Sequence, residues 1–534
     1  MDTLNGTSWD VVIAGTGLQP ALLALALSRS NKKILHLDSN DHYGGREAAL
    51  SITEIESWVD RQKTNPSRSP FRNASIIQPP STPEHSVRLA APRAYSLSLS
   101  PCVLYTRSAL LLALVSSKAH EQLEFLAVGS WFVYQQSAPS DSGSTSGQLV
   151  RVPNSREDIF SNPALTLRAK GALVKFLRFV AVYQEEQETW TDWKNKSFAD
   201  FLVKKFRISP DFHGPLLALS MSSKPDDKVT TDFALANIHR HLTSMGVFGA
   251  GFSAVLPKYG GLSEVVQVAC RAAAVGGAVY VLNRGIDNVD AVSDEEPGIQ
   301  VVLQGGDKFV TSHLIGTHDQ LPKAWNTPDG TEEQLANVCA RSISVVSSTM
   351  DALFPRGAEG SPPPSAAVVV YPSGTIAHVD GQGFNPNPIH VLVHSADTGE
   401  CPKGQCVIYA MTSIPLGDAS PLLEIAVQAL LTSIQEAVHP LVLWTVKYEI
   451  VSQPGGPSSI RNEDDENTRI FLEPPSGPVF DDGVVESVKQ AWQIITGEPE
   501  DSFMRFVDRN VEPDEGGAVD EIPENTLPPS DQVV

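Results

Sequence analysis

The chain has 534 residues, enough for two or three cores of ordinary size. Apolar residues make up 41% of it and charged residues 19%, a composition typical of a globular protein. Its formal net charge of -22 argues against non-specific nucleic-acid binding, which needs clustered lysine and arginine, so we expect no nucleic-acid partner. An acidic chain of this kind suits a basic protein partner.

The five cysteines are scattered, and only Cys401 and Cys406 lie near each other in the sequence. No second pair of Cys or His residues completes a zinc site, so we predict that the protein holds no metal. The N-terminus lacks a basic region followed by an apolar core, and the longest apolar runs are well short of the roughly 20 residues that cross a bilayer. We therefore expect a cytoplasmic protein that contacts lipid only non-covalently.

The first residues predict a strand–helix–strand unit. Residues 10–14 (DVVIA) are typical of a buried strand, residues 18–29 of a helix, and residues 34–38 (ILHLD) of a second strand. This order indicates a parallel sheet. Residues 62–93 are rich in Pro, Ser and Asn and predict a surface loop, and the Ser- and Gly-rich residues 137–147 predict a flexible linker or hairpin tip.

A long stretch in the middle of the chain has helical periodicity. It runs from residue 156 to about residue 244 and predicts a helical domain inserted into an α/β domain. Strand patterns return after it, at residues 278–283, 299–304, 308–317, 341–350, 366–372, 390–396 and 406–414. A helix at residues 419–438 and a strand–turn–helix at residues 469–497 follow.

These elements predict an α/β fold with a Rossmann-type sheet domain, of the kind that binds FAD or NAD(P), and an inserted all-helical domain. We assign residues 1–150 and 246–510 to the sheet domain and residues 151–245 to the helical domain. Residues 511–534 are rich in proline and acidic residues and predict a disordered tail.

The turn after the first strand carries an incomplete dinucleotide-binding motif. Gly15 and Gly17 stand where the motif needs a tight turn and a close approach of the pyrophosphate, and Asp38 ends the second strand, where an acid binds ribose. Pro20 replaces the third glycine. Proline suits the first turn of a helix, but it removes one amide from the helix N-terminus that would bind phosphate. These residues alone leave nucleotide or flavin binding open.

The residues after the second strand bear on two families. Residues 42–46 (HYGGR) contain the GGR that flavin amine oxidases carry at this place. The stretches GTGL and LHLDSN, with the aromatic Tyr43 before the glycine pair, resemble instead the superfamily of Rab GDP-dissociation inhibitors and Rab escort proteins. Residues 257–287 (PKYGGLSEVVQVACRAAAVGGAVYVLNRGID) resemble its second signature, and residues 93–134 and 152–183 resemble its middle segments.

The resemblance implies a flavoprotein-like fold that uses no flavin, so we expect no cofactor. It places a Rab-binding platform on Tyr43, Glu264, Arg271, Val279 and Val281. Glu264 and Arg271 are two helical turns apart, so they share a face and offer charge-assisted contacts. Plainer roles also fit: Tyr43 could pack over a glycine turn, the charged pair could be an exposed helix pair of small value, and the valines could be strand core.

Residues 479–495 (VFDDGVVESVKQAWQII) resemble the C-terminal region of escort proteins, and the extra segments 62–93 and 355–365 also favour this branch, in a fungal-type member. The resemblance implies a protein that binds GDP-bound Rab GTPases, presents them to the Rab geranylgeranyltransferase α/β heterodimer, and delivers the lipidated product through transient membrane contact. It implies no catalytic activity of its own. A recycling Rab GDP-dissociation inhibitor and a flavin-dependent amine oxidase are the alternatives.

Carriage of a geranylgeranyl chain needs an apolar surface, because burial is worth about 0.8 kcal/mol per CH₂. Only residues 156–244 offer enough helical apolar surface, although most of these residues also fit a helical core. By resemblance, Phe198 and Arg207 of this region dock the transferase α-subunit. Core packing is the plainer role for a phenylalanine here.

Residues 246–256 (GVFGAGFSAVL) stand where the superfamily has a mobile effector loop that contacts a membrane or a partner. The residues concerned are Phe248, Gly249, Gly251 and Phe252, and we expect both aromatic side chains to be exposed. An ordinary flexible connection is the alternative. The segment does not match a phosphate-binding loop, because no GK[ST] follows its glycines.

Overall fold

The structure, a computed structural model, describes residues 4–506 with several gaps. The gaps are residues 29, 65–68, 79–87, 137–146, 153–165, 250, 292–297, 323–336, 356–362, 379–382, 453–459, 463–466, 473 and 475. The predicted linker at 137–146, most of the extra segment at 355–365 and the predicted tail at 511–534 therefore lie outside the described residues. In the described part of the chain, no helix is both long and apolar enough to cross a membrane.

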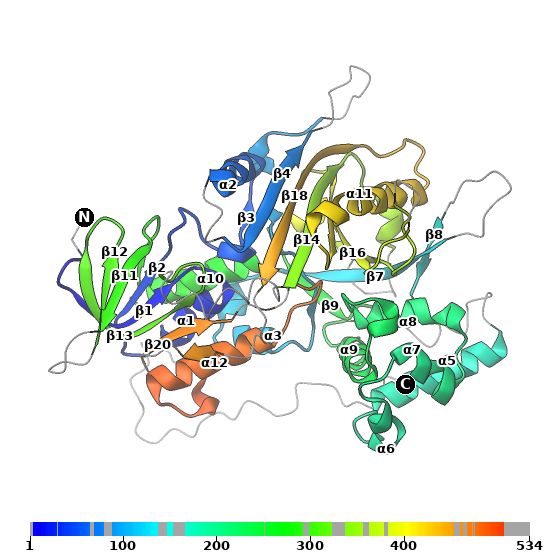
Figure 1. Ribbon diagram of the computed structural model, residues 1–534, viewed down its shortest axis with the longest axis horizontal. Helices are drawn as coiled ribbons and strands as arrows, with labels where there is room; N and C mark the ends of the chain where they lie inside the picture. The colour runs from blue at the N-terminus through cyan, green and yellow to red at the C-terminus, as the bar shows by residue number, and fades with distance from the viewer. Residues whose placement is uncertain are drawn as a thin grey trace.

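The strands form two large sheets (Figure 1). The first sheet has the order β10–β2–β1–β13–β12–β11, and β20 pairs with both β13 and β19. Its strands are β1 (Ser8–Ala14), β2 (Ile34–Leu37), β10 (Val279–Val281), β11 (Ile286–Ala291), β12 (Ile299–Leu303), β13 (Lys308–Thr317), β19 (Ile460–Asn462) and β20 (Thr468–Phe471). β10, β2, β1, β13 and β20 run parallel, as a strand–helix–strand start requires.

The second sheet has the order β4–β18–β14–β17–β16–β15–β7–β9–β6, with β8 beside β7. Its strands are β4 (Phe71–Ile77), β6 (Leu104–Tyr105), β7 (Phe125–Gln136), β8 (Gly147–Arg151), β9 (Ala254–Pro257), β14 (Asn337–Val346), β15 (Ala366–Tyr371), β16 (Ile389–Ser395), β17 (Cys406–Thr412) and β18 (Val442–Ser452). All pairs are antiparallel except β15 with β7. A small pair, β3 (Ala49–Leu50) and β5 (Leu97–Ser98), forms a separate two-stranded sheet.

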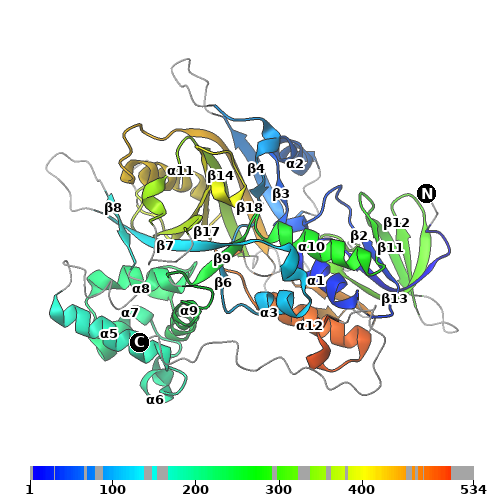
Figure 2. The ribbon, with the colours of Figure 1, turned by 180° about the vertical axis from the view of Figure 1, so that it is seen from behind.

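The helices divide among three places (Figures 1 and 2). The first sheet packs against α1 (Leu18–Leu27), α3 (Ala109–Ser116), α10 (Leu262–Val275) and α12 (Gly483–Thr496). The second sheet packs against α2 (Ile52–Thr64) and α11 (Leu416–Ser433). The helical part, which lies beside β7, consists of α5 (Leu167–Ala181), α6 (Gln187–Trp190), α7 (Phe198–Phe201), α8 (His213–Ser220) and α9 (Thr231–Ser244).

α1 is enclosed on all sides, and all ten of its residues are buried. Its sequence LQPALLALAL is apolar all round, which suits a helix with no face toward water. It packs between β1, α10 and α12. Pro20 fits in its first turn because the amide that proline lacks is not needed there for the helix.

Several strand predictions are confirmed, among them residues 10–14, 34–38 and 308–317. The predicted surface loop at residues 62–93 is wrong in part, because α2 extends into it and β4 lies within it. Phe71 and Ala74 of β4 are buried, and the strand pairs with β18. The polar residues that suggest a loop lie on the exposed positions of β4, so composition alone conceals this strand.

The helical part shares its core with the second sheet. Phe176, Phe198 and Phe201 belong to one cluster with Trp131 of β7 and residues of β14 and β18. The described helices fall in the region predicted to be helical, but their apolar residues are buried against each other and against the sheet. The predicted sheet domain likewise consists of two sheets, and both of its sequence segments contribute strands to each.

Asp482, just before α12, joins three elements that are far apart in the sequence. One carboxylate oxygen accepts hydrogen bonds from the Ser108 hydroxyl and from the Ala109 amide at 3.0 Å, at the start of α3. The other forms an ion pair with Arg240 of α9, with an N–O distance of 2.7 Å. This carboxylate therefore connects the helical part to the helices that cover the first sheet.

We predict that Asp482→Ala lowers the free energy of unfolding by about 2 kcal/mol, because it removes the acceptor of the Ala109 amide and the ion-pair partner of the partly buried Arg240. Urea unfolding followed by circular dichroism measures this change. Asp501→Ala, at an exposed position, is the control, and its effect should stay within about 0.5 kcal/mol. Equal effects of the two substitutions would contradict the role given to Asp482.

Candidate functional site

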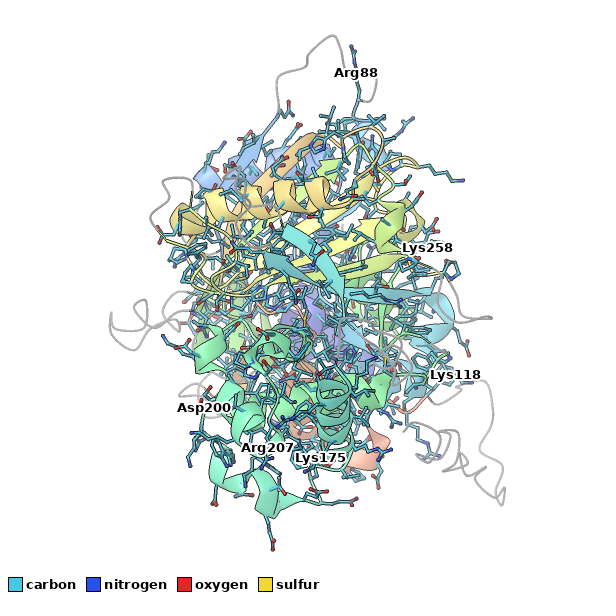
Figure 3. The ribbon with its side chains drawn as sticks, turned by 90° about the vertical axis from the view of Figure 1, so that its right-hand side faces the viewer. Arg88, Lys118, Lys175, Asp200, Arg207 and Lys258 are labelled. Carbon is cyan, nitrogen blue, oxygen red and sulfur yellow. The ribbon has the colours of Figure 1, made fainter. Side chains whose placement is uncertain are left out.

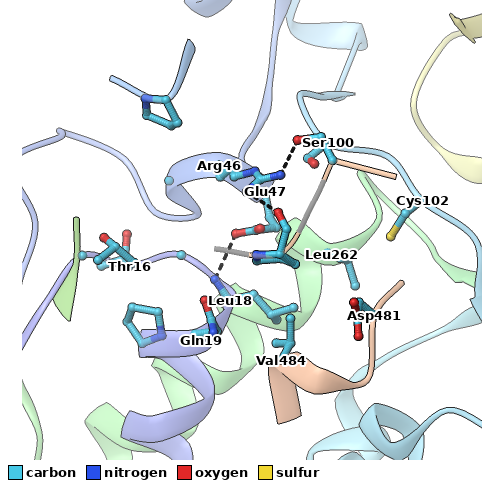
Figure 4. A pocket seen from close by; sticks show the side chains of 18 of the residues that line it. Thr16, Leu18, Gln19, Arg46, Glu47, Ser100, Cys102, Leu262, Asp481 and Val484 are labelled. Carbon is cyan, nitrogen blue, oxygen red and sulfur yellow. Dashed lines mark hydrogen bonds between the residues drawn. The ribbon is translucent and has the colours of Figure 1, made fainter. Parts of the chain in front are cut away.

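The loop after β1 lies at the carboxyl end of the parallel strands, where sheets of this type bind ligands. Gly15 has a φ of +96°, and a Cβ there would approach the Thr317 hydroxyl to 2.8 Å. Only glycine fits this turn without strain. Gly17 caps α1 in an extended conformation. The two glycines therefore take the positions that the motif predicts, at a pocket between the first sheet, α1 and the start of α12 (Figure 4).

Asp38, at the end of β2, is 1% exposed and its acceptors are engaged within the chain. One oxygen accepts from the Thr16 amide at 2.7 Å and from the Thr16 hydroxyl at 2.6 Å. The other accepts from the Asn40 amide at 2.7 Å and from its side chain at 2.9 Å. Burial raises the pKa of Asp38, and these hydrogen bonds oppose the rise. Asp38 therefore fixes the β1 and β2 loops against each other.

Glu47 lies at the N-terminus of α1 (Figure 4). Its Oε2 accepts from the Leu18 amide at 3.0 Å, and a Cβ on Gly17 would lie 3.3 Å from the same oxygen. The positive end of a helix attracts anions, and in dinucleotide-binding folds the pyrophosphate is the anion bound there. Here the chain's own carboxylate takes that position, so a bound pyrophosphate would meet a like charge. The residues around α1 therefore do not fit a dinucleotide.

Arg46 ties this loop to the C-terminal part of the chain. Its guanidinium donates to the Pro474 carbonyl at 2.9 Å and to the Ser476 hydroxyl. The arginine of the GGR sequence is 8% exposed and so holds the wall of the pocket rather than facing solvent. Arg46 also lowers the pKa of Glu47, against the larger effect of burial, which raises it.

Tyr43 begins the same loop and is partly exposed. Its ring meets that of Tyr280 edge-on, with centroids 5.9 Å apart, and Tyr280 in turn lies 4.8 Å from the ring of His36 on β2. Burial raises the pKa of the Tyr43 hydroxyl. Tyr280 was not among the residues predicted for the platform. Its position between the two predicted valines was the signal that could have identified it.

α10 lies next to this aromatic group and carries the predicted charged pair. Its apolar face is buried against α1, while Glu264 is partly exposed and Arg271 is exposed. Burial raises the pKa of Glu264, and the charge of Arg271 lowers it. The two side chains therefore share an electrostatic environment on the open face of α10, as their spacing predicts. α10 leads directly into β10, the edge strand that carries Tyr280.

Val279 and Val281 lie on the other face of the first sheet. Val281 packs against the cluster that contains Val12 and Leu35, whereas Tyr280 and Tyr43 pack on the helix-covered face. Val279, at 41% exposed, points the same way as Val281 because side chains alternate along a strand. The five predicted platform residues therefore do not form one continuous surface. Tyr43, Glu264 and Arg271 lie on the helix side, and the valines lie around the edge of the sheet.

The loop after α9 has one exposed aromatic residue instead of the two that were predicted. Phe248 is 57% exposed, but Phe252 is 5% exposed and belongs to the core around α1 and α10. Gly249 and Gly251 have φ values of +138° and +91°, which favour glycine. Phe252 is buried because it lies beside β9, where the chain re-enters the second sheet.

Phe198 has no exposed surface. It packs against Phe176 and Phe201, with ring centroids 6.0 Å and 6.5 Å apart, so its side chain is core and presents no surface to a partner in this conformation. Arg207 is exposed and has a φ of +58°. A docking role for Arg207 stays a prediction.

Within the described residues, no group of three or more His, Cys, Asp or Glu side chains is arranged to hold a metal ion. Cys401 and Cys406 are both buried, and their thiols donate to the carbonyls of Gln405 and Thr349.

A family model described as GDP dissociation inhibitor matches residues 4–327, which is more than half of the chain. The chain belongs to this family. Among curated relatives, it is 30% identical over 431 residues to Rab proteins geranylgeranyltransferase component A of Saccharomyces cerevisiae and 27% identical over 406 residues to the Candida albicans protein of the same name. These alignments cover 80% and 76% of this chain, but only 65% and 59% of the relatives.

Solved structures show the fold. A Rab GDI from Plasmodium falciparum superposes with a TM-score of 0.61 at 19% identity, over 92% of this chain and 99% of that one. An oxidoreductase from Methanosarcina mazei superposes with a TM-score of 0.54 at 11% identity, over 91% and 100%. The predicted α/β fold of the FAD- and NAD(P)-binding type, in its GDP-dissociation-inhibitor form, is confirmed.

We predict that the effect of Glu47→Gln on the free energy of unfolding depends on pH. Compared with the unsubstituted protein at the same pH, the variant should be more favoured at pH 7 than at pH 4. The substitution keeps an oxygen for the Leu18 amide and removes a charge. Because burial raises the pKa of Glu47, its proton stabilises the folded chain below the ordinary pKa of glutamate, and that stabilisation is lost as the pH rises through the folded value.

Urea unfolding of both proteins at the two pH values measures this difference. Glu56→Gln is the control, because Glu56 is exposed on α2 and the same chemical change there should give a difference that does not depend on pH. An effect of Glu47→Gln that is equal at both pH values, or less favourable at pH 7, would show that desolvation does not raise the pKa of Glu47.

Proposed function

We propose that this protein acts as a Rab escort protein. It binds GDP-bound Rab GTPases, presents them to the Rab geranylgeranyltransferase heterodimer as a non-catalytic component, and delivers the lipidated Rab to membranes. The similarity to the yeast transferase component A over 80% of this chain carries the proposal. A cytoplasmic location with transient membrane contact belongs to the same proposal.

The Rab would bind at the open edge of the first sheet. Tyr43 contributes a partly exposed ring that Tyr280 holds in place, and α10 contributes the charges of Glu264 and Arg271. Aromatic residues and arginine are the side chains that most often carry the energy of a protein interface. Val279 would contact the Rab only if the partner extends around the edge strand.

The geranylgeranyl group would bind to the helical part. This part is rich in apolar residues, but in the described residues most of them are buried in the core shared with the second sheet. In the described helical part, the large apolar side chains with more than a third of their surface exposed are Leu167, Val182, Val203 and Phe233. Lipid uptake would therefore require these helices to separate, and the exposed Phe248 beside α9 is placed to take part.

We also propose that the protein uses no flavin or nicotinamide cofactor. The position of Glu47 at the N-terminus of α1 and the proline at position 20 support this, since both oppose a pyrophosphate at that helix. The flavin amine oxidase alternative rests on Gly15 and Gly17, on Asp38 and on the GGR sequence. The arginine of that sequence instead binds the chain's own C-terminal segment.

We expect Arg271→Ala to weaken binding of an unprenylated, GDP-loaded Rab by about 10- to 100-fold, because an interface arginine that loses its partner costs about 1.4–2.8 kcal/mol. Isothermal titration with the purified proteins measures the dissociation constant. Lys403→Ala, an exposed cation beside the second sheet, is the matched control and should leave it unchanged. Saturable binding that Arg271→Ala leaves intact would move the platform elsewhere, and no binding at all would reject the function.

The same titration with a prenylated Rab distinguishes the escort function from that of a recycling GDP-dissociation inhibitor. Binding of the unprenylated form supports the escort function, whereas binding of the prenylated form alone supports the inhibitor.

We expect the purified protein to show no flavin absorbance and to retain none after incubation with FAD and desalting. The like charges of Glu47 and a pyrophosphate at one helix N-terminus give the reason. The visible spectrum before and after incubation is the measurement, with a flavin amine oxidase as the positive control. Retention of FAD at one equivalent would support the oxidase alternative.

A further inference from the structure

The charge of the helical part differs in sign from that of the whole chain. Residues 167–244 carry twelve lysine and arginine side chains against nine aspartate and glutamate side chains, whereas the chain has a net charge of -22. The excess positive charge is therefore concentrated in one region of an otherwise acidic protein. Such a concentration produces a local field that attracts anionic groups.

Five of these cations form what we call the basic face, on two elements of the helical part: Lys175, Arg178, Lys204, Lys205 and Arg207. All five are exposed. Lys175 and Arg178 are three residues apart on α5, so they share one side of the helix. Lys204, Lys205 and Arg207 lie in and just after the short π-helical turn η5 (Leu202–Phe206).

The packing beneath the basic face holds the two elements together. Phe206, between Lys205 and Arg207, meets the rings of Phe176 and Phe179 of α5 with centroids 5.2 Å and 5.1 Å apart. Figure 3 shows Lys175 and Arg207 at the same end of the molecule, away from Arg88. The charges are therefore carried on a fixed surface.

Few acidic side chains compensate these charges. Lys204 has a weak ion pair with Asp200, at 3.9 Å, and lies over the ring of Trp193. Among the described residues, no acidic group lies within ion-pair distance of Lys175, Lys205 or Arg207. The basic face can therefore attract a polyanionic partner.

The chain itself contains a polyanion of suitable size. Residues 511–534 include seven aspartate and glutamate residues and no lysine or arginine. The described chain ends at Phe506, whose amide donates to the Ser116 carbonyl of α3. The 28 residues that follow can extend to about 90 Å, and a compact protein of 534 residues has a radius of gyration of about 24 Å. The tail can therefore reach any part of the surface.

We infer that the acidic tail, residues 511–534, docks on the basic face of the helical part in the same molecule. Tethering gives the tail an effective concentration on the order of millimolar, so several weak, exposed ion pairs suffice to hold it. Because Arg207 is also a predicted contact for the transferase, the docked tail would compete with an anionic partner for this surface. The inference itself does not depend on the proposed function.

Zero-length carbodiimide cross-linking of the full chain, followed by peptide mass spectrometry, tests this. We expect tail carboxylates to cross-link to Lys175, Lys204 and Lys205 at low salt, at least about fivefold more than to the exposed control lysines Lys63 and Lys403. The yield should fall at least about fivefold in 0.5 M NaCl, because screening at that concentration shortens the range of exposed charges.

A pair of arginine variants makes the test specific. The double substitution Arg178→Glu and Arg207→Glu keeps the three reporter lysines and should lower their cross-linking to the tail at least about fivefold. The matched control, Arg88→Glu and Arg93→Glu, makes the same change in net charge elsewhere on the surface and should have no effect. Circular dichroism would show that both variants are folded.

The inference is overturned if tail cross-links are absent, or if they are distributed over exposed lysines without preference. It is equally overturned if the preferred cross-links survive both high salt and the arginine substitutions. Absent cross-links together with binding of phosphatidylserine vesicles to the basic face would assign the surface to a membrane instead.

Discussion

The hydrogen bond from the Leu18 amide to the Glu47 carboxylate is the contact on which the site depends. A helix N-terminus at the carboxyl end of a parallel sheet is a strong anion site, and an unfilled one buried in a protein is unfavourable. Glu47 fills this position from within the chain, so the helix N-terminus has an acceptor of its own. Asp38 does the same for the neighbouring loop, where it accepts from Thr16 and Asn40.

This arrangement places the candidate binding residues outside the pocket. The loop that supplies Glu47 begins with Tyr43, so the residues that close the pocket also position an aromatic ring at the edge of the first sheet. α10 packs on α1 and leads into β10, which brings Arg271 and Tyr280 to the same edge. The charged pair of α10 lies outside the crevice, on the open face of the helix, where a protein partner can reach it.

The two ends of the molecule differ in the way that charge is used. Around the first sheet, the important charges are buried or partly buried carboxylates that accept backbone amides, and their energies depend on desolvation. On the helical part, exposed cations are compensated weakly, and their interactions depend on salt. The Asp482 carboxylate joins the two regions through α3 and α9, so a change in the helical part has a direct connection to the helices of the first sheet.

The sequence by itself determined the strand–helix–strand start, the two glycines, the helical region and the shared face of Glu264 and Arg271. These features depend on local periodicity and on the backbone freedom of glycine, which neighbouring residues specify. Only the tertiary structure decided that Phe198 and Phe252 are buried, that β4 pairs with β18, and that Tyr280 and Val279 face opposite sides of an edge strand. It also placed Glu47 at α1, because a contact between residues 29 positions apart depends on how the loops meet and leaves no mark in local sequence.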